Sequence, residues 1–325
     1  MHTQQGEIPA PPQPLPLPSE GLPAVTCPEI HALSIDADDG VRLAATRVGR
    51  PAAPATLVYV HPLLRERRFW SPLSLRVHEQ LGGAVAQITY DQRGHGESGT
   101  PHLRRITTLR RLADDLDMVL AHASGSVVLV VHSTAAQLVY AYATVHRDRA
   151  AELAGLVFLN AAAEFPCFPR YLRAWPQRLI RLRPHRVLDP VTAAGEAVLR
   201  YRLRHSGRQL VVDVDTDPRV SIDILGAHPG FGLSVGVAQQ LRPIPSIVLA
   251  GEHDTLVPPQ RAVALADAVW ADYDLVFGAG HDLPHTHLER ATDTITTTLD
   301  HALRAQLEHP SPPATHSPDP ERGEA

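Results

Sequence analysis

Short apolar runs alternate with segments of helical periodicity along most of the chain. Two alternating runs, 31–35 and 41–48, flank turn-forming residues 36–40 and predict a β-hairpin. Further strands are expected at 56–60, 84–90, 126–132, 155–159, 245–250 and 273–277. Helices are expected over 72–81, 109–119 and 288–303. One further helix is expected to begin at 135, and another is expected to end at 270. Strands that alternate with helices predict an α/β fold with a mostly parallel central sheet and helices on both faces.

Three segments break this pattern. Residues 1–27 are rich in proline and predict a disordered arm, and 306–325 predict a similar tail. The core is therefore expected over 28–163 and 244–305, with 164–243 inserted as a helical cap. Between residues 165 and 208 this insertion holds ten arginines against two acids. A solvated helical face explains such a run, and attraction to an anionic substrate or a membrane surface is the alternative.

Composition and charge narrow the class of protein. The chain has 325 residues, of which 44% are hydrophobic, so it can bury one large core. A formal net charge of -5 argues against a nucleic-acid binder. The two cysteines, Cys27 and Cys167, are far apart and predict neither a disulfide framework nor a metal site. No signal-peptide pattern and no apolar run of about 18 residues is seen, so a cytoplasmic protein without a transmembrane segment is expected.

The strand at 126–132 ends abruptly on Ser133 and continues as a helical pattern. A serine on a sharp strand-to-helix turn is typical of a nucleophile elbow, in which the hydroxyl stands clear of the backbone. The usual consensus is Gly-x-Ser-x-Gly, whereas this chain has Val131 and Ala135 at the glycine positions. A plain alternative is a buried strand followed by a serine that caps the next helix.

A serine nucleophile needs a base within about 3 Å, and the base needs an acid to orient it. Asp254 follows the strand at 245–250, and His281 follows the strand at 273–277. Because parallel strands end at the same edge of a sheet, we expect both side chains to lie near Ser133. The chain order Ser, Asp, His is the order found in α/β hydrolases.

These motifs together resemble the α/β-hydrolase superfamily, in particular the monoacylglycerol lipase and lysophospholipase-like group of serine hydrolases. Residues 90–98, Tyr-Asp-Gln-Arg-Gly-His-Gly-Glu-Ser, match the Asp-x-Arg-Gly-His-Gly-x-Ser loop of that group. Residues 251–254, Gly-Glu-His-Asp, resemble its acid loop, and Gly280-His281 its catalytic histidine. The resemblance spans roughly residues 29–305 and implies an α/β-hydrolase fold with a cap after the sixth strand.

The resemblance also assigns roles. Ser133 would attack, His281 would carry the proton and Asp254 would orient the histidine. The oxyanion would be bound by the backbone N–H groups of Thr134 and Leu63, since Pro62 has no N–H.

Several neighbouring residues compete for these roles or support them. His285 and His287 are rivals for the base, and Glu164 is a rival for the acid. His132 is interpreted as a packing residue. Asp91, Arg93 and His95 are interpreted as braces of their loop.

The sequence therefore predicts a serine hydrolase that cleaves an ester or related acyl bond of an apolar small molecule, with no metal or organic cofactor. In the resembling family the loop after the third strand begins His-Gly, whereas this chain has His61-Pro62. Because glycine positions of the family pattern are thus lost at Val131, Ala135 and Pro62, one alternative is a catalytically inactive member that binds a ligand or partner. Another is a carbon–carbon bond hydrolase or perhydrolase with the same triad. The sequence does not specify the oligomeric state.

Overall fold

The computed structural model describes residues 28–102, 106–164, 216–227 and 232–308. The expected arm, most of the expected tail and residues 165–215 and 228–231 of the expected cap lie outside these ranges, and the predictions for them stay predictions. Within the described part of the chain, every strand and helix that the periodicity indicated is present, with ends displaced by a few residues.

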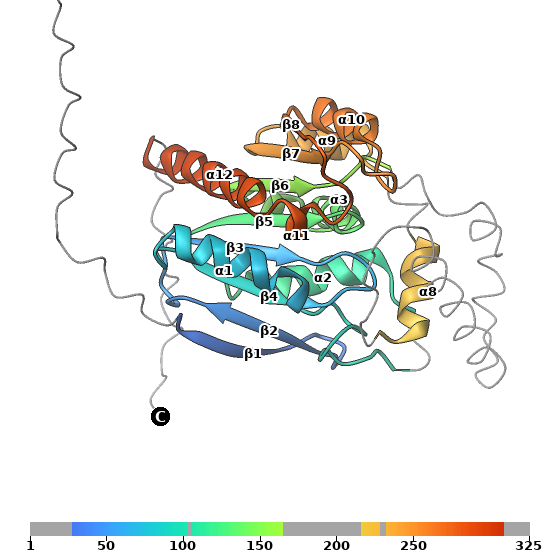
Figure 1. Ribbon diagram of the computed structural model, residues 1–325. Coiled ribbons are helices and arrows are strands. Elements are labelled where there is room, and N and C mark those ends of the chain that lie inside the picture. Colours follow the sequence, from blue (N-terminus) through green and yellow to red (C-terminus); the bar gives the residue numbers. More distant parts are fainter. Residues whose placement is uncertain (1–27, 103–105, 165–215, 228–231, 309–325) are drawn as a thin grey trace, which may run out of the picture.

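A single eight-stranded sheet forms the centre of the molecule, in the order β1-β2-β4-β3-β5-β6-β7-β8 (Figure 1). The strands are β1 (Ile30–Asp36), β2 (Arg42–Val48), β3 (Ala55–Val60), β4 (Ala86–Tyr90), β5 (Ser126–His132), β6 (Gly155–Leu159), β7 (Ser246–Gly251) and β8 (Asp272–Val276). The pairs β1/β2 and β2/β4 are antiparallel, and all other neighbours are parallel. The predicted hairpin and the predicted parallel sheet are both confirmed.

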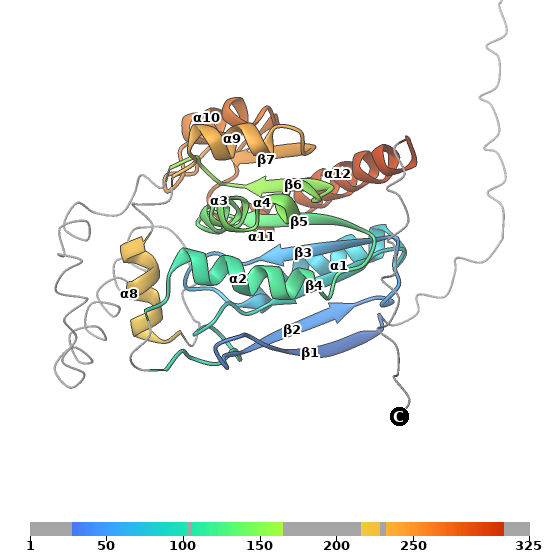
Figure 2. The same cartoon turned by 180° about the vertical axis from the view of Figure 1, so that it is seen from behind.

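Helices cover both faces of the sheet. On the face toward the viewer in Figure 1 lie α1 (Ser71–Gln80), α11 (Leu283–Thr286) and α12 (Leu288–Glu308), and η1 (Arg67–Trp70) directly precedes α1. Figure 2 shows the opposite face, with α2 (Leu109–Leu120), α3 (Ala135–Val145), α4 (Arg147–Ala151), α9 (Val235–Leu241) and α10 (Pro259–Val269). The helix α12 continues past 305, where the core was expected to end.

Two buried apolar clusters hold these layers together. Side chains of a strand alternate between the faces, so Leu57 and Tyr59 of β3 join the cluster under α1 and α12. Val58 and Val60 join the cluster under α2, α3 and α10. Because β3 is buried at every position, its sequence is a continuous apolar run with one threonine rather than an alternating one.

The helix α8 (Pro218–Ala227) lies at the carboxyl edge of the sheet and packs on the loop after β4. The Asp217 N–H donates to the Gly94 carbonyl at 2.8 Å, and Val220 is buried against Gly94. Gly94 has φ +70°, and a Cβ there would lie 2.6 Å from the Val220 side chain. Only glycine therefore allows this helix to approach the loop so closely. Both α8 and α9 come from the range expected to form the cap, and α9 packs beside α3 and α10.

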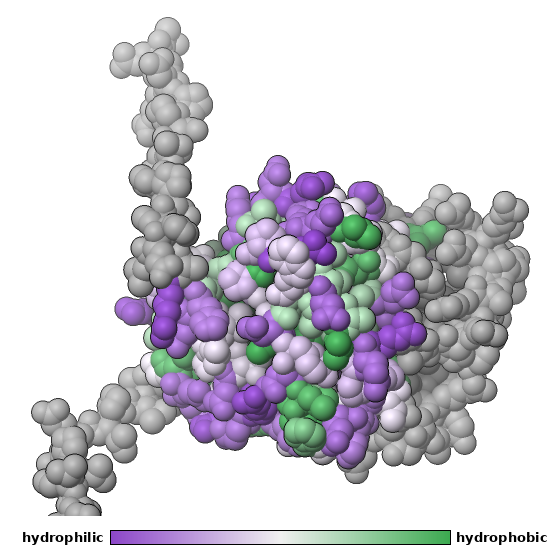
Figure 3. Space-filling view, turned by 90° about the horizontal axis from the view of Figure 1, so that it is seen from above, coloured by the Kyte–Doolittle hydropathy of each residue, from purple (hydrophilic) through white to green (hydrophobic). Residues whose placement is uncertain are grey.

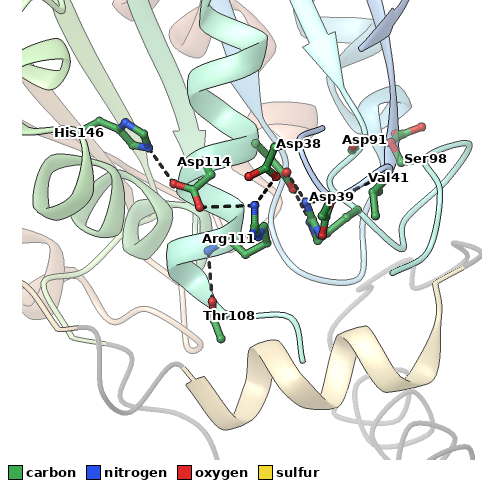
Figure 4. A network of polar contacts seen from close by, with 11 residues as sticks. Asp38, Asp39, Val41, Asp91, Ser98, Thr108, Arg111, Asp114 and His146 are labelled. Carbon is green, nitrogen blue, oxygen red and sulfur yellow. Dashed lines mark hydrogen bonds and ion pairs between the residues drawn. The ribbon is translucent and has the colours of Figure 1, made fainter. Parts of the chain in front are cut away.

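Polar contacts anchor α2 to its neighbours (Figure 4). Thr108 caps the helix by accepting from the Arg111 N–H at 3.2 Å. The Arg111 guanidinium forms an ion pair with Asp38 in the β1–β2 turn. One turn further along α2, Asp114 accepts from His146 at 3.0 Å, which ties α2 to the end of α3. These contacts fix α2 beside α3, the helix that begins directly after Ser133 and Thr134.

The surface seen from above Figure 1 mixes hydrophilic and hydrophobic residues without one continuous apolar face (Figure 3). Two large apolar side chains flanking β8, Trp270 and Phe277, are exposed. The Arg242 guanidinium lies over the Trp270 ring, 4.4 Å from its centroid, and covers part of it. Among the described residues, no helix has both the length and the apolar composition that crossing a membrane requires.

Candidate active site

The carboxyl edge of the sheet brings the expected site residues together. Ser133 directly follows β5, Asp254 comes three residues after β7 and His281 follows β8 by five residues. In the sheet, β6 separates β5 from β7, and β8 lies beyond β7 at the edge. The parallel order therefore gathers residues from three distant parts of the chain at one site.

Ser133 occupies a sharp turn between β5 and α3. Its φ is +54°, in the left-handed region that a non-glycine residue rarely adopts. Its N–H donates to the Leu159 carbonyl of β6 at 3.0 Å, which ties the turn to the neighbouring strand. Backbone strain of this kind is common at functional sites, where it costs about 1–3 kcal/mol.

The bulky Val131 is accommodated without opening this turn. Its side chain is fully buried and belongs to the same apolar cluster as Ala135 and Ala136 of α3. Small residues on α3 thus leave room for the β-branched side chain where the family pattern has glycine. Ser133 therefore keeps its left-handed turn conformation although Val131 replaces the glycine of the family pattern.

Asp254 and His281 form a buried pair. The Nδ1 atom of His281 lies 2.7 Å from Oδ2 of Asp254, whose side chain is fully buried. The other carboxylate oxygen accepts from the N–H groups of Leu256 and Val257, each at 2.8 Å. Three donors therefore fix the carboxylate, and the carboxylate orients the imidazole ring.

The backbone around this pair is tightly packed. A Cβ at Gly251 would lie 2.6 Å from the Ala279 carbonyl oxygen and 2.7 Å from that of Gly280. The chain before Asp254 and the chain before His281 can approach each other only because residue 251 is glycine. The His253 N–H also donates to the Ala279 carbonyl at 2.8 Å.

Ser133 lies at the same edge of the sheet as this pair, but its hydroxyl is not hydrogen-bonded to it. Within the described residues, no hydrogen bond joins Ser133 to His281, so that part of the expected geometry is not met. Such bonds are often long or poorly aligned before a substrate binds. The arrangement thus supplies a strained serine and an oriented base at one edge.

Asn160 and His132 hold the loop that carries His281. Asn160 follows β6 with φ +48° and is fully buried. Its Nδ2 donates to the carbonyls of Gly280 and His281 at 2.9 and 2.8 Å, and its Oδ1 accepts from the Gly251 N–H at 2.7 Å. Nε2 of His132 lies 2.9 Å from the same His281 carbonyl.

His132 acts as a neutral hydrogen-bond donor in this contact. Burial, together with the nearby His281, keeps the pKa of His132 well below its usual value. A neutral ring that donates from Nε2 has its acceptor at Nδ1. The ring also packs against that of His281, with centroids 4.7 Å apart. These contacts agree with its interpretation as a packing residue.

The rivals for the catalytic roles lie in other environments. His285 packs edge-on against Phe69, with ring centroids 4.6 Å apart, and His287 bonds to the Thr286 hydroxyl. Glu164 is exposed. Of the three histidines, the one that contacts a carboxylate among the described residues is His281.

The two expected oxyanion donors are joined to each other. The Leu63 N–H donates to the Thr134 hydroxyl at 2.8 Å. Leu64, the next residue, has φ +63°, so the loop after β3 leaves this position through a strained turn. The resemblance assigns the Leu63 N–H to the oxyanion, but this N–H already donates to the Thr134 side chain.

His61 fixes the loops after β3 and β4 to each other. Its Nε2 accepts from the Gln92 N–H at 2.9 Å, and its Nδ1 lies 2.9 Å from the Pro62 carbonyl. Burial lowers the pKa of His61 to about 4, so the ring is neutral at pH 7. These bonds hold the loop that ends at Leu63.

The loop 91–99 is braced by buried charges. Asp91 pairs with Arg67 and accepts from the Glu97 N–H at 2.9 Å. Arg93 is almost fully buried between Asp115 and Asp39. Burial raises the pKa of Asp115 to about 6, although Arg93 opposes that shift. Asp91 and Arg93 thus act as braces, as their interpretation from the sequence proposed.

Comparison with known proteins places this geometry in a family. The model of the family described as "Serine aminopeptidase, S33" matches residues 80–285, more than half of the chain. The chain belongs to this family of α/β hydrolases. The expected α/β-hydrolase fold is confirmed, and the protein is a hydrolase of that fold. No curated protein matches the sequence.

Solved structures of other hydrolases match the fold of this chain over most of its length. A thermophilic esterase from Thermogutta terrifontis is 25% identical with a TM-score of 0.60, and the match covers 84% of this chain and 99% of that one. An enol-lactonase from Burkholderia xenovorans LB400 is 21% identical with a TM-score of 0.60, covering 82% and 100%. An esterase from Exiguobacterium antarcticum is 16% identical with a TM-score of 0.62, covering 83% and 100%. The last two show the fold alone.

Sequence reasoning missed two features of the site. Asn160 gave no signal beyond its place at the end of a strand, where a buried amide can bond to neighbouring loops. The Thr134 side chain gave no signal either, because the residue after a nucleophile is expected to act through its backbone N–H. Across the described residues, no group of three His, Cys, Asp or Glu side chains is arranged to hold a metal ion.

Proposed function

We propose that the protein is a serine hydrolase that cleaves an ester or related acyl bond. Ser133 attacks the carbonyl carbon, His281 takes the hydroxyl proton and then gives it to the leaving group, and Asp254 holds the histidine in the productive orientation. An acyl-enzyme forms on Ser133, and water releases it with His281 again as base.

The observation that carries the proposal is the buried Asp254–His281 pair beside a serine with φ +54°. A His281 ring that donates from Nδ1 to the carboxylate has a basic Nε2, which is the atom that accepts a proton from a nucleophile. The esterase from Thermogutta terrifontis, at 25% identity, supports an ester as substrate.

The esterase comparison supports an ester as substrate, and we propose further that this ester is an apolar small molecule. It would bind at the carboxyl edge of the sheet, where Asp217, directly before α8, donates to the loop 91–99.

Hydrolysis of a series of p-nitrophenyl esters of increasing chain length tests the proposal. Ser133→Ala and His281→Ala should each lower kcat by at least about 1,000-fold, because triad members act as a unit. His285→Ala is the matched control and should keep kcat within a few-fold. Equal losses in the His285 and His281 variants, or hydrolysis that survives Ser133→Ala, would contradict the assignment.

One observation favours a second candidate. The Leu63 N–H is already bonded to Thr134, so the expected oxyanion site lacks one open donor. An inactive member that binds a ligand at this edge would have no need of that donor. The same ester series distinguishes the two, since an inactive binder shows no hydrolysis that depends on Ser133.

A further inference from the structure

The side chain of Thr134 is directed away from its own helix. Thr134 is the N-cap of α3, where a threonine hydroxyl normally accepts from an N–H of the first turn. Here φ is -60° and ψ -21°, and the side chain makes no capping hydrogen bond. The hydroxyl instead reaches the loop after β3, 71 residues away in sequence, and accepts from the Leu63 N–H.

This contact leaves the proton of the hydroxyl uncommitted. A hydroxyl group has one donor and two acceptor positions, and the Leu63 N–H uses one acceptor. Among the described residues, the Thr134 hydroxyl donates to no other group. Thr134 is largely buried beside Ser133, at the N-terminus of α3, where the helix dipole favours negative charge.

We propose that the Thr134 hydroxyl is itself an oxyanion donor, in the position where the family pattern uses a backbone N–H of the loop after β3. The inference rests on the proposed function and deepens it. When the carbonyl oxygen of the substrate becomes negative, the Thr134 O–H donates to it, while the Leu63 N–H holds the hydroxyl oxygen and polarises it. The oxyanion is thus bound by the Thr134 hydroxyl and the Thr134 backbone N–H.

The loop sequence gives a reason for this arrangement. The family loop begins His-Gly, whereas this chain has His61-Pro62, so one N–H is missing, and the path of the loop includes Leu64 at φ +63°. The hydrogen bonds from Gln92 to His61 keep that path in place. The Thr134 side chain extends from the start of α3 to the Leu63 N–H of this loop, so it supplies a hydroxyl where the sequence lacks the N–H of residue 62.

The test compares three variants at one position. Thr134→Val keeps the shape and removes the hydroxyl, Thr134→Ser keeps the hydroxyl, and Thr134→Ala removes both hydroxyl and methyl. We expect kcat for a p-nitrophenyl ester to fall about 100- to 1,000-fold in the valine variant, as for the loss of one oxyanion donor, with KM changed only a few-fold. The serine variant should keep kcat within about 10-fold.

A boronic acid that forms a tetrahedral adduct with the active serine gives a second readout. Its inhibition constant should rise in the valine variant by a factor similar to the loss in kcat, because the adduct carries the negative oxygen. A purely structural role would lower the melting temperature without this selective effect. If the valine variant does not fold, the serine and alanine variants make the same comparison.

The outcomes separate the two claims. Wild-type hydrolysis that does not depend on Ser133 would overturn the proposed function and this inference with it. Ser133-dependent hydrolysis that the valine substitution leaves unchanged or accelerates would overturn only the inference. In that case the hydroxyl covers the Leu63 N–H, and its removal frees that N–H to bind the oxyanion directly.

Discussion

Replacing Asn160 with alanine should lower both stability and turnover, because one buried side chain connects the ends of β6 and β7 to the His281 loop. The substitution removes three hydrogen bonds, to Gly251, Gly280 and His281. At about 1 kcal/mol each, their loss costs about 3 kcal/mol. Alanine at φ +48° adds about 1 kcal/mol, since asparagine tolerates the left-handed region better. The expected decrease in the free energy of unfolding is therefore about 4 kcal/mol.

The effect on turnover has a separate cause. The His281 carbonyl keeps its contact with His132 but loses the one from Asn160, so the loop is free to move. A displacement near 1 Å costs on the order of 100-fold in rate. Urea unfolding measures the first effect, and kcat for ester hydrolysis measures the second.

Gln87→Ala is the matched control. Gln87 is also a buried amide, which accepts from the Tyr59 hydroxyl at 2.6 Å and donates to the Ser74 carbonyl at 3.0 Å. It lies near the start of β4, away from the carboxyl edge. Its loss should cost about 2 kcal/mol of stability and leave kcat unchanged. If Asn160→Ala kept the wild-type kcat despite its loss of stability, Asn160 would have only a structural role. Asn160→Gly, which adopts the same φ without strain, replaces the alanine variant if that variant does not fold.

Two further predictions concern buried charge. Burial lowers the pKa of His61 to about 4 in the folded protein, against 6.5 in the unfolded chain, so the unfolded chain binds more protons between these two pH values. The free energy of unfolding therefore falls by on the order of 3 kcal/mol as the pH decreases from 6.5 to 4. Urea unfolding at several pH values should show that the His61→Gln variant lacks this fall in the free energy of unfolding. An identical pH dependence of stability in the wild-type protein and the variant would refute the prediction. Arg93→Met leaves Asp39 and Asp115 buried without their cation and should cost about 3–5 kcal/mol at pH 7, less at pH 5 where carboxylates protonate more readily. A loss below about 1 kcal/mol at pH 7 would contradict this account of the ion network.

The sequence predicted the fold closely because apolar runs in this chain are long and well separated. The six residues of β3 are all buried, and such a run has no other stable place than the middle of a sheet. The ends of helices were predicted less closely, because fraying and capping depend on local contacts. The helix α12, for example, continues past the residue 305 at which the core was expected to end. The helix α9 was expected only as an unspecified part of a helical cap over 164–243, since its seven residues are too few for a clear period.

The candidate site was predictable only where a residue follows a strand. Ser133, Asp254 and His281 share that position, so the topology alone brings them to one edge. The contact between Leu63 and Thr134 was not predictable, because it depends on how a loop with Pro62 and a left-handed Leu64 turns in space. The same holds for Asn160, whose partners are backbone groups of loops that no sequence pattern identifies.

The central claim is that Ser133 is an activated nucleophile with His281 as its base. A fluorophosphonate probe, which bonds covalently to an activated serine hydroxyl, tests this most directly when the labelled peptide is identified by mass spectrometry. The account predicts one label per chain, on Ser133, and almost none in folded His281→Ala. A label on another serine, or no label on the folded wild-type protein, would contradict it.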